Sequence, residues 1–216
     1  MTWQEIISKA TGFLNSKNVP DARVASELLA ARLLRVGRGM LAGELEKNVP
    51  EKCLEAMRRG MARLVKGEPV QYVLGEWDFR TLTLRCDRRA LIPRPETEEL
   101  VTRVLSHLHL RLPSSVSSPL VVDVGTGTGA IILSLAKEFK SDAIFLGTDV
   151  SEEAIALAKQ QAEDEAEKVR KKDSKSYNKC IAKAYTIKIL LTFIIFYPLY
   201  LGFAWIIGGV VKHAQK

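Results

Sequence analysis

Apolar residues along the first third of the chain recur every three or four positions, as they do on one face of an amphipathic helix. Three such stripes lie between Thr2 and Lys66, and Thr2 with Glu5 has capping-box spacing at the start of the first. The stripes consist of Ile6, Ile7, Ala10, Phe13 and Leu14; Val24, Leu28, Leu29 and Leu33; and Leu54, Met57 and Leu64. We therefore predict a small helical bundle over residues 1–67, whose pattern suggests no function other than a docking surface.

Residues 68–112 have a different pattern. Between Pro69 and Arg89, aromatic and alternating apolar residues are typical of a hairpin or of connecting strands. These residues are Tyr72, Val73, Leu74, Trp77, Phe79, Leu82 and Leu84. In the IPRPETE run that follows at residues 92–98, two prolines keep the residues before them extended. A helical pattern then covers residues 98–110. We predict a hairpin linker, a rigid turn and one helix.

From residue 113 on, short apolar runs alternate with helical patterns. Residues 120–124 and 143–146 have the composition of buried parallel strands, and residues 130–139 between them have the pattern of a helix. Ser151, followed by two glutamates, is suited to cap a further helix. This alternation predicts an α/β fold with a parallel sheet, so that a Rossmann-like unit is expected at residues 113–162.

The C-terminal part of the chain changes character again. Residues 163–188 are rich in charged side chains, whereas residues 189–211 contain none. An uncharged run of this length predicts a single transmembrane helix. Pro198 and the glycines within the run are tolerated better in a membrane helix than in a soluble one. A buried helix of a globular protein is the alternative interpretation.

The distribution of charge orients this predicted span. The 216 residues carry a net charge of +7, but ten Lys and Arg and a single acidic residue lie from Lys168 onward, so the rest of the chain is near neutral. The overall basicity therefore does not indicate nucleic-acid binding. Basic residues before the span place the N-terminal part in the cytosol and predict a membrane location through residues 189–211. Without that span, a cytoplasmic protein is expected.

Other reactive side chains form no recognisable site. The three cysteines include no CxxC pair, which argues against a disulfide scaffold or a zinc site. His107 and His109 are two positions apart and point in different directions on a helix, and His213 lies by itself near the C-terminus. We predict no metal site and no histidine-based catalytic triad.

The strongest chemical signal is DVGTGTG at residues 123–129, between a predicted strand and a predicted helix. Glycine permits a sharp turn and a close approach of the backbone to a ligand, and the free N–H groups of a helix N-terminus suit an anion. Asp149 ends the next strand, where an acid accepts hydrogen bonds from ribose hydroxyls. A dinucleotide site, with Ala130 in place of the third glycine, and a turn that binds nothing remain alternatives. No GKS or GKT follows, which excludes a Walker A loop.

The loop and its surroundings carry a family resemblance. VVDVGTGTGAIILSLA at residues 121–136, PVQYVLGEWDF at 69–79 and LIPRPETEELV at 91–101 resemble the HemK/PrmC family, and the likeness spans residues 2–162. Enzymes of this family use S-adenosylmethionine to methylate the side-chain amide of glutamine in the GGQ motif of peptide-chain release factors. The resemblance implies a substrate-docking domain at 1–67, a linker at 68–112 and a partial methyltransferase domain at 113–162. A basic linker at 163–188 and the membrane span would follow.

The resemblance also implies roles for particular residues. Asp149 would hold the ribose, and Asp123 would orient the loop or meet the amino group of the cofactor. The residues that would wrap its methionine part are Gly125, Thr126, Gly127, Thr128 and Gly129. The residues that match the family's loop at the mouth of the site are Arg94, Pro95, Glu96 and Thr97. For this second group, a rigid linker followed by solvated glutamates is the competing interpretation.

One motif of the family is missing from the printed sequence. No Asn-Pro-Pro-Tyr, the motif that grips the target glutamine, occurs in it, so no catalytic residue is assigned. We expect a release-factor glutamine methyltransferase in truncated form, with a non-catalytic membrane-anchored adaptor as the alternative. A small membrane protein whose tail carries the function is a third interpretation. A spliced or fused product, a faulty gene prediction and a protein that has lost catalysis are all consistent with the join near Ala162.

Overall fold

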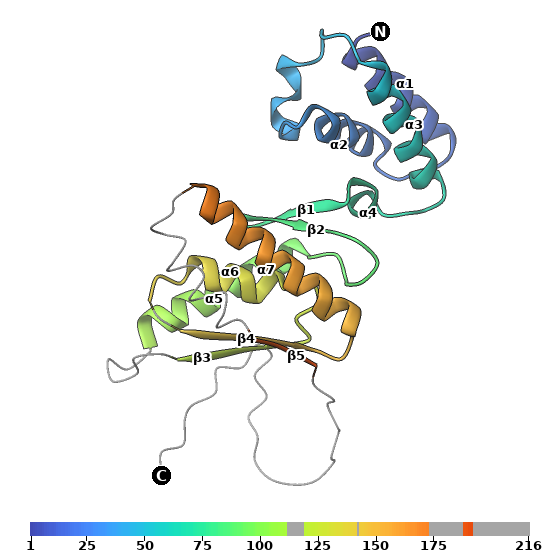
Figure 1. Cartoon of the computed structure of the whole chain (residues 1–216). Coiled ribbons are helices and arrows are strands. Elements are labelled where there is room, and N and C mark those ends of the chain that lie inside the picture. The colour runs from blue at the N-terminus through green and yellow to red at the C-terminus, as the bar shows by residue number, and fades with distance from the viewer. Residues whose placement is uncertain (112–118, 142, 173–187, 192–216) are drawn as a thin grey trace, which may run out of the picture. The chain divides into compact units, whose positions relative to one another are not determined.

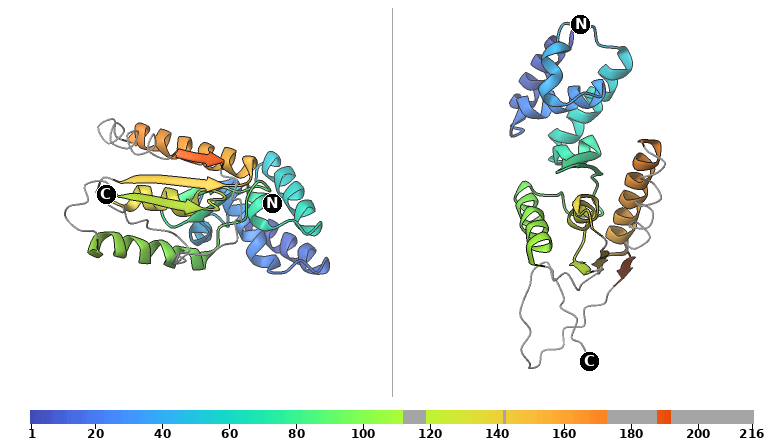
Figure 2. Two further views of the ribbon diagram at one scale, coloured as in Figure 1. Left: turned by 90° about the horizontal axis from the view of Figure 1, so that it is seen from below. Right: turned by 90° about the vertical axis from the view of Figure 1, so that its left-hand side faces the viewer.

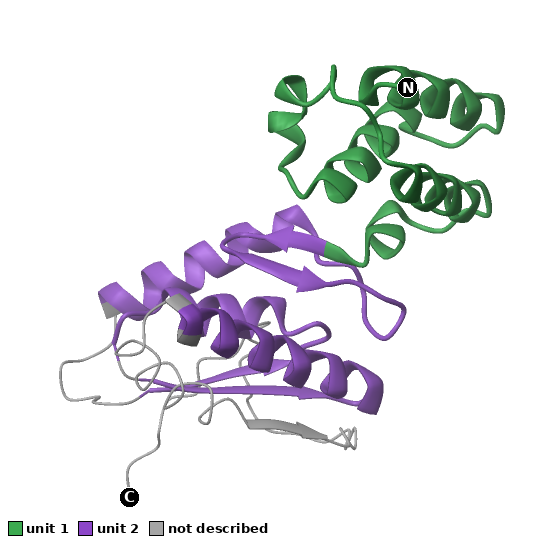
Figure 3. Cartoon of the chain, turned by 45° about the horizontal axis from the view of Figure 1, so that its top comes forward, with its two compact units in different colours: residues 1–76 green, residues 77–216 purple. Residues whose placement is uncertain are grey.

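The computed structural model describes residues 1–111, 119–141, 143–172 and 188–191 (Figure 1). They belong to two compact units, Met1–Glu76 and Trp77–Lys216 (Figure 3). The division falls within strand β1 (Glu76–Phe79), and the predicted border at residues 67 and 68 precedes the short helix α4 (Val70–Leu74).

The first unit is the predicted helical bundle. It comprises α1 (Trp3–Ser16), α2 (Ala22–Leu34), the 3₁₀ helix η1 (Arg38–Gly43), α3 (Glu51–Val65) and α4. The capping box forms, since the Glu5 N–H donates to Thr2 Oγ1 and the Thr2 N–H donates to Glu5 Oε2. The buried core includes residues of the predicted stripes of α1 and α3, among them Ile6, Ala10, Leu14, Met57 and Leu64. Phe13 is an exception, since its position at the margin of the stripe leaves it 44% exposed. In α2, only Leu29 of the predicted stripe is buried, and the buried face of this helix is formed mainly by alanines.

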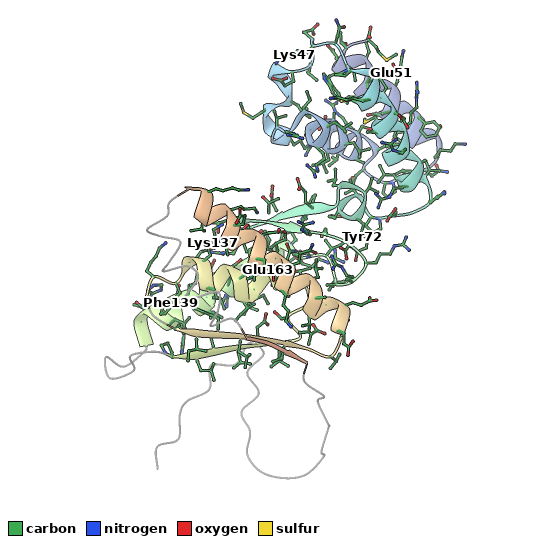
Figure 4. The ribbon with its side chains drawn as sticks, in the orientation of Figure 1. Lys47, Glu51, Tyr72, Lys137, Phe139 and Glu163 are labelled. Carbon is green, nitrogen blue, oxygen red and sulfur yellow. The ribbon has the colours of Figure 1, made fainter. Side chains whose placement is uncertain are left out.

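The predicted hairpin forms over a shorter stretch than the apolar pattern suggests. Its strands are β1 and β2 (Leu82–Arg85), whereas Tyr72, Val73 and Leu74 belong to helix α4 (Figure 4). Pro69 precedes this helix, and Gly75 ends it in a left-handed conformation. Proline and glycine are tolerated at these two ends of a helix, which explains why the apolar run is divided here.

Helices of the second unit cover one face of a three-stranded parallel sheet (Figures 1 and 2). The order of elements is α5 (Pro95–Arg111), β3 (Leu120–Val124), α6 (Ala130–Glu138), β4 (Ile144–Asp149), α7 (Glu152–Lys172) and β5 (Lys188–Leu191). The strands lie in the order β3-β4-β5. Val121 and Phe145 on this face pack with Ile132 and Leu133 of α6 and Val101 of α5. The α/β fold with a parallel sheet is thus confirmed.

Strand β5 corrects part of the C-terminal prediction. The predicted transmembrane helix begins at residue 189, but residues 188–191 pair with β4, with Ile189 opposite Gly147. This pairing provides hydrogen-bond partners for the backbone groups at the edge of β4, which a sheet of β3 and β4 alone would leave exposed. No described helix is both long and apolar enough to cross a membrane. The remainder of the predicted span, residues 192–211, lies outside the described residues.

Helix α7 runs without a break through Ala162, where the family resemblance was expected to end. Its inward face anchors the hairpin. The side chain of Gln161, only 2% exposed, donates from Nε2 to the Arg85 carbonyl and accepts from the Arg85 N–H, both at 2.9 Å. The Gln161 amide therefore takes the place of a neighbouring strand at the edge of β2. One turn further on, Asp164 Oδ2 pairs with Arg85 Nε at 2.6 Å.

The turn of the hairpin is fixed by Arg80, which lies between the two strands with a positive φ of 52°. Its guanidinium forms a two-pronged ion pair with Glu138 of α6, with distances of 2.7 and 2.9 Å. Arg80 also donates to the Glu98 carbonyl of α5 at 2.7 Å. Its hydrogen bond to Glu138 is the main cause that lowers the pKa of that carboxyl. One side chain therefore joins the hairpin to two helices.

Replacing Gln161 by alanine tests the anchoring of the hairpin. Gln161→Ala leaves the N–H and the carbonyl of Arg85 without their partner, so we expect a loss of about 1–3 kcal/mol in unfolding free energy. Urea denaturation followed by circular dichroism measures it. Lys159→Ala, at an exposed position of the same helix, is the matched control. Equal urea midpoints for the two variants would contradict an anchoring role.

Candidate functional site

The glycine-rich loop follows β3 at the carboxyl edge of the sheet and leads into α6. The N–H groups of Gly125 and Thr126 both donate to the Thr148 carbonyl of β4 at 2.8 Å. The Gly129 N–H then donates to the Thr126 carbonyl, also at 2.8 Å, which closes the turn. The loop is therefore held by the backbone of the neighbouring strand.

The three glycines of the loop adopt conformations that other residues rarely take. Their φ angles are 79° at Gly125, 54° at Gly127 and 81° at Gly129. Space is also restricted at Gly129, since an added Cβ would lie 3.1 Å from Leu133 Cδ1 and 3.3 Å from the Cβ of Ala158. The lack of a side chain at Gly129 thus allows α6 and α7 to approach each other closely. A Cβ added at Gly125, in contrast, would have no atom within 4 Å. The loop combines a packed end with an open end.

Asp123 lies beneath the loop and is only 7% exposed. Its Oδ2 accepts a hydrogen bond of 2.8 Å from Thr126 Oγ1. Burial, which disfavours the charged form, raises the pKa of Asp123, and the bonds from Thr126 and from the Ile132 backbone oppose that rise. Gly147, opposite Asp123 in the sheet, leaves room for Thr126, whose Oγ1 would lie 2.9 Å from an added Cβ there. Asp123 is therefore joined to the loop through the Thr126 hydroxyl.

Asp149 ends β4 next to the same loop. Its Oδ2 accepts a hydrogen bond of 2.8 Å from the Gly127 N–H, and its Oδ1 accepts one of 3.0 Å from the Ser151 N–H. Ser151 in turn accepts from the Ala154 N–H at the start of α7. A carboxylate has about four lone-pair positions, so Asp149 retains acceptor capacity for hydroxyl groups. Asp149 is half-buried, which leaves it accessible to a ligand.

The IPRPETE segment begins α5. Pro95 is the first residue of that helix, and the Thr97 N–H donates to the Arg94 carbonyl at 3.1 Å. Arg94, Pro95 and Glu96 are exposed and Thr97 is half-buried. Glu98, for which a solvated side chain was one expectation, instead accepts a hydrogen bond from the Arg80 N–H.

A residue that sequence reasoning missed lies close to the loop. Ala90 Cβ is 3.9 Å from the position of a Cβ added at Gly127. The turn that carries Ala90 is held by Arg89, which pairs with Asp87 at 2.7 Å and donates to Gln160 of α7 at 3.2 Å. The position of Ala90 directly before LIPRPETE was the available signal, but a small apolar residue gives no chemical indication of its role.

Other reactive groups of the described chain take structural roles. No cluster of three or more potential metal ligands occurs among the residues that were searched. His109 packs its ring against Phe139, 5.2 Å between centroids, and its Nδ1 lies 2.7 Å from the Leu105 carbonyl. Burial raises the pKa of the Cys86 thiol to about 11, so it remains a thiol at neutral pH. It is therefore a poor nucleophile.

Comparison with known proteins agrees with this arrangement. Residues 5–75 match a PrmC N-terminal domain, and residues 117–186 match a methyltransferase domain. A human relative, the MTRF1L release factor glutamine methyltransferase, is 36% identical over 163 residues, which cover 74% of this chain and 48% of that protein. Release factor glutamine methyltransferases of Fusobacterium nucleatum and Pasteurella multocida are 32% and 37% identical, over 71% and 78% of this chain and 42% and 61% of their own lengths.

These matches support the resemblance of the chain to the HemK/PrmC family. The chain spans about half the length of the curated relatives that it matches. The methyltransferase match continues to residue 186, beyond Ala162, where the resemblance was expected to end. The glutamine-methyltransferase class expected from the sequence agrees with the names of these relatives.

Replacing Thr126 by valine tests how the glycine-rich loop is held. Thr126→Val keeps the shape but removes the donor to Asp123, so we expect a loss of about 1–3 kcal/mol in unfolding free energy at pH 8. The lost bond favours the ionised carboxylate. The variant should therefore be most destabilised above the Asp123 pKa, and its deficit should shrink as acid protonates Asp123.

Urea denaturation between pH 4 and pH 8 measures this dependence. Thr126→Ser, which keeps the hydroxyl group, serves as the control and should follow the parent protein. A deficit of Thr126→Val that stays constant with pH would show that the hydroxyl does not act through the Asp123 charge.

Proposed function

We propose that this chain binds S-adenosylmethionine at the loop of residues 125–129 and acts as a protein-glutamine methyltransferase on peptide-chain release factors. The observation that carries the proposal is the bond from the Gly127 N–H to Asp149, which joins the glycine-rich loop to an acid at the carboxyl edge of a parallel sheet. Nucleotide-type ligands bind at this edge in open α/β sheets. The names of the relatives support the choice of substrate.

The residues present fit this cofactor. Asp149 has acceptor capacity left for ribose hydroxyls, and Gly125 exposes backbone where a methionine moiety needs a close approach. Asp123 and Thr126 fix the loop from below. When bound, the cofactor supplies an electrophilic methyl group on its sulfonium. The contribution of these residues is to bind and orient it, and positioning of this kind accounts for much of an enzyme's rate advantage.

A non-catalytic adaptor is the second candidate function. The N-terminal unit has its own buried core, which is compatible with a docking role independent of the cofactor.

Asp149→Ala tests the cofactor proposal. Removing the carboxylate deletes the acceptor for the ribose and the partner of the Gly127 N–H, so we expect at least a tenfold weaker affinity for S-adenosylmethionine, about 1.4 kcal/mol. Isothermal titration calorimetry on the full chain measures it. Asp78→Asn, at an exposed position of β1, is the control and should bind like the parent. Failure of the parent to bind at millimolar cofactor would reject the proposal.

Transfer of a radiolabelled methyl group to a release factor separates the two candidates. The enzyme proposal expects label on a glutamine of the GGQ motif and none with Asp149→Ala. Intact cofactor binding together with zero transfer would instead favour the adaptor.

We also propose a membrane location through residues 192–211, which follow β5 and contain no charged residue. At 1.5 Å per residue, a helix over this shortened run is still about as long as a bilayer core is thick. The basic residues before β5 favour a cytosolic N-terminal part. The protein should stay with the membrane pellet after carbonate extraction, whereas a variant ending at Leu191 should not. Release of the full chain into the supernatant would overturn this location.

A further inference from the structure

Helix α7 supports both the glycine-rich loop and the acid beside it. A Cβ added at Gly129 would lie 3.3 Å from the Cβ of Ala158, so the helix packs directly against the end of the loop. The Ser151 N–H, directly before the helix, donates to Asp149 Oδ1 at 3.0 Å. A residue that is tied to α7 is therefore tied to the frame of the candidate cofactor site.

Arg89 joins the turn of residues 87–90 to this helix. Its Nη2 donates to Asp87 Oδ2 at 2.7 Å and to Gln160 Oε1 at 3.2 Å, and its Nε donates to Asp87 Oδ1 at 2.9 Å. The hydrogen bond from Arg89 is also the main cause that lowers the pKa of Asp87, so the pair is charged at neutral pH. A planar guanidinium can bond to two partners at once in a fixed geometry. Arg89 therefore bridges the turn and α7.

Ala90, at the end of this turn, lies against the middle of the loop. Its Cβ is 3.9 Å from the position of a Cβ added at Gly127, which is an ordinary van der Waals distance. Both residues are half-buried, so the surface that they form is accessible to a ligand. The Gly127 N–H also donates to Asp149 at 2.8 Å. A displacement of Ala90 would thus alter the surroundings of the loop at the residue that bonds to Asp149.

We propose that Arg89 is a positioning residue of the cofactor site, which holds Ala90 against Gly127 by bridging Asp87 and Gln160. Ala90 then forms part of the wall of the site, and its small side chain leaves room for the ligand. Arg89 acts through Ala90 and makes no contact with the cofactor. This inference rests on the proposed binding of S-adenosylmethionine to the loop, and it adds residues that belong neither to the loop motif nor to the IPRPETE segment.

Arg89→Ala tests the bridge. In calorimetry on the full chain, the dissociation constant for S-adenosylmethionine should rise about tenfold, because the wall of the site is no longer pre-organised. The number of cofactor molecules bound per chain should stay unchanged, whereas a merely structural role would lower that number and leave the affinity of the folded molecules intact. Arg89→Lys can pair with Asp87 but cannot replace the guanidinium bridge, so it should recover part of the affinity.

Arg103→Ala is the matched control. It makes the same charge change and breaks an exposed ion pair of 2.6 Å with Glu99 on α5. Exposed ion pairs of this kind contribute little, so its affinity for S-adenosylmethionine should stay within about twofold of the parent. Circular dichroism verifies that each variant is folded.

Two further variants test whether Arg89 acts through its neighbours. Gln160→Ala should weaken binding, and the double variant with Arg89→Ala should bind no more weakly than the weaker single variant, because both remove one bridge. Ala90→Leu should weaken binding about tenfold with Arg89 intact, since the larger side chain presses on Gly127.

Parent-like affinity of Arg89→Ala or of Ala90→Leu would overturn this inference, and so would additive losses in the double variant. Failure of the parent to bind S-adenosylmethionine would instead reject the proposed function, and with it this inference. The two failures are therefore distinguishable in one series of titrations.

Discussion

The parallel pairing of β3 with β4 is the constraint on which the candidate site depends. Pairing places Val124 opposite Thr148, so both strands end at one edge of the sheet. The Thr148 carbonyl can then accept the N–H groups of Gly125 and Thr126, and Asp149 can reach the N–H of Gly127. A shift in register would remove these three bonds together. The path of the loop is therefore determined mainly by the backbone of β4. The conformational freedom of the glycines allows the chain to follow that path.

A second set of contacts holds the hairpin over this sheet. Arg80 reaches α5 and α6, and Gln161 of α7 bonds to both backbone groups of Arg85. The chain that leaves β2 then turns through Asp87 and Arg89 and brings Ala90 close to Gly127. The linker thus lies next to the glycine-rich loop. Family likeness in the linker and in the loop reflects one physical unit built from two separate stretches of sequence.

The sequence predicted the elements whose signals are local. The Thr2 and Glu5 capping box, the amphipathic stripe of α1 and the strand–glycine–helix unit all form as expected. Contacts between distant positions were not predictable from the sequence. The residues around Gln161 do not indicate that its side chain bonds to the backbone of β2. Ala90 has no functional group that would mark it as a neighbour of the loop. The roles assigned to Asp123 and Asp149 stay predictions, although their hydrogen bonds to the loop agree with them.

The misassigned start of the predicted span reflects the ambiguity of a short apolar run. Parallel strands are usually buried on both faces and are therefore apolar throughout. Here the described helices of the second unit cover one face, while Leu120, Ile144 and Val124 on the other are 37%, 40% and 61% exposed. A short apolar run that suits such a strand also suits a membrane helix, and periodicity alone does not separate the two. Residues 189–191 are an example, since their apolar sequence suits either structure. They form a strand because they pair with the edge of β4, a contact that the local sequence does not reveal.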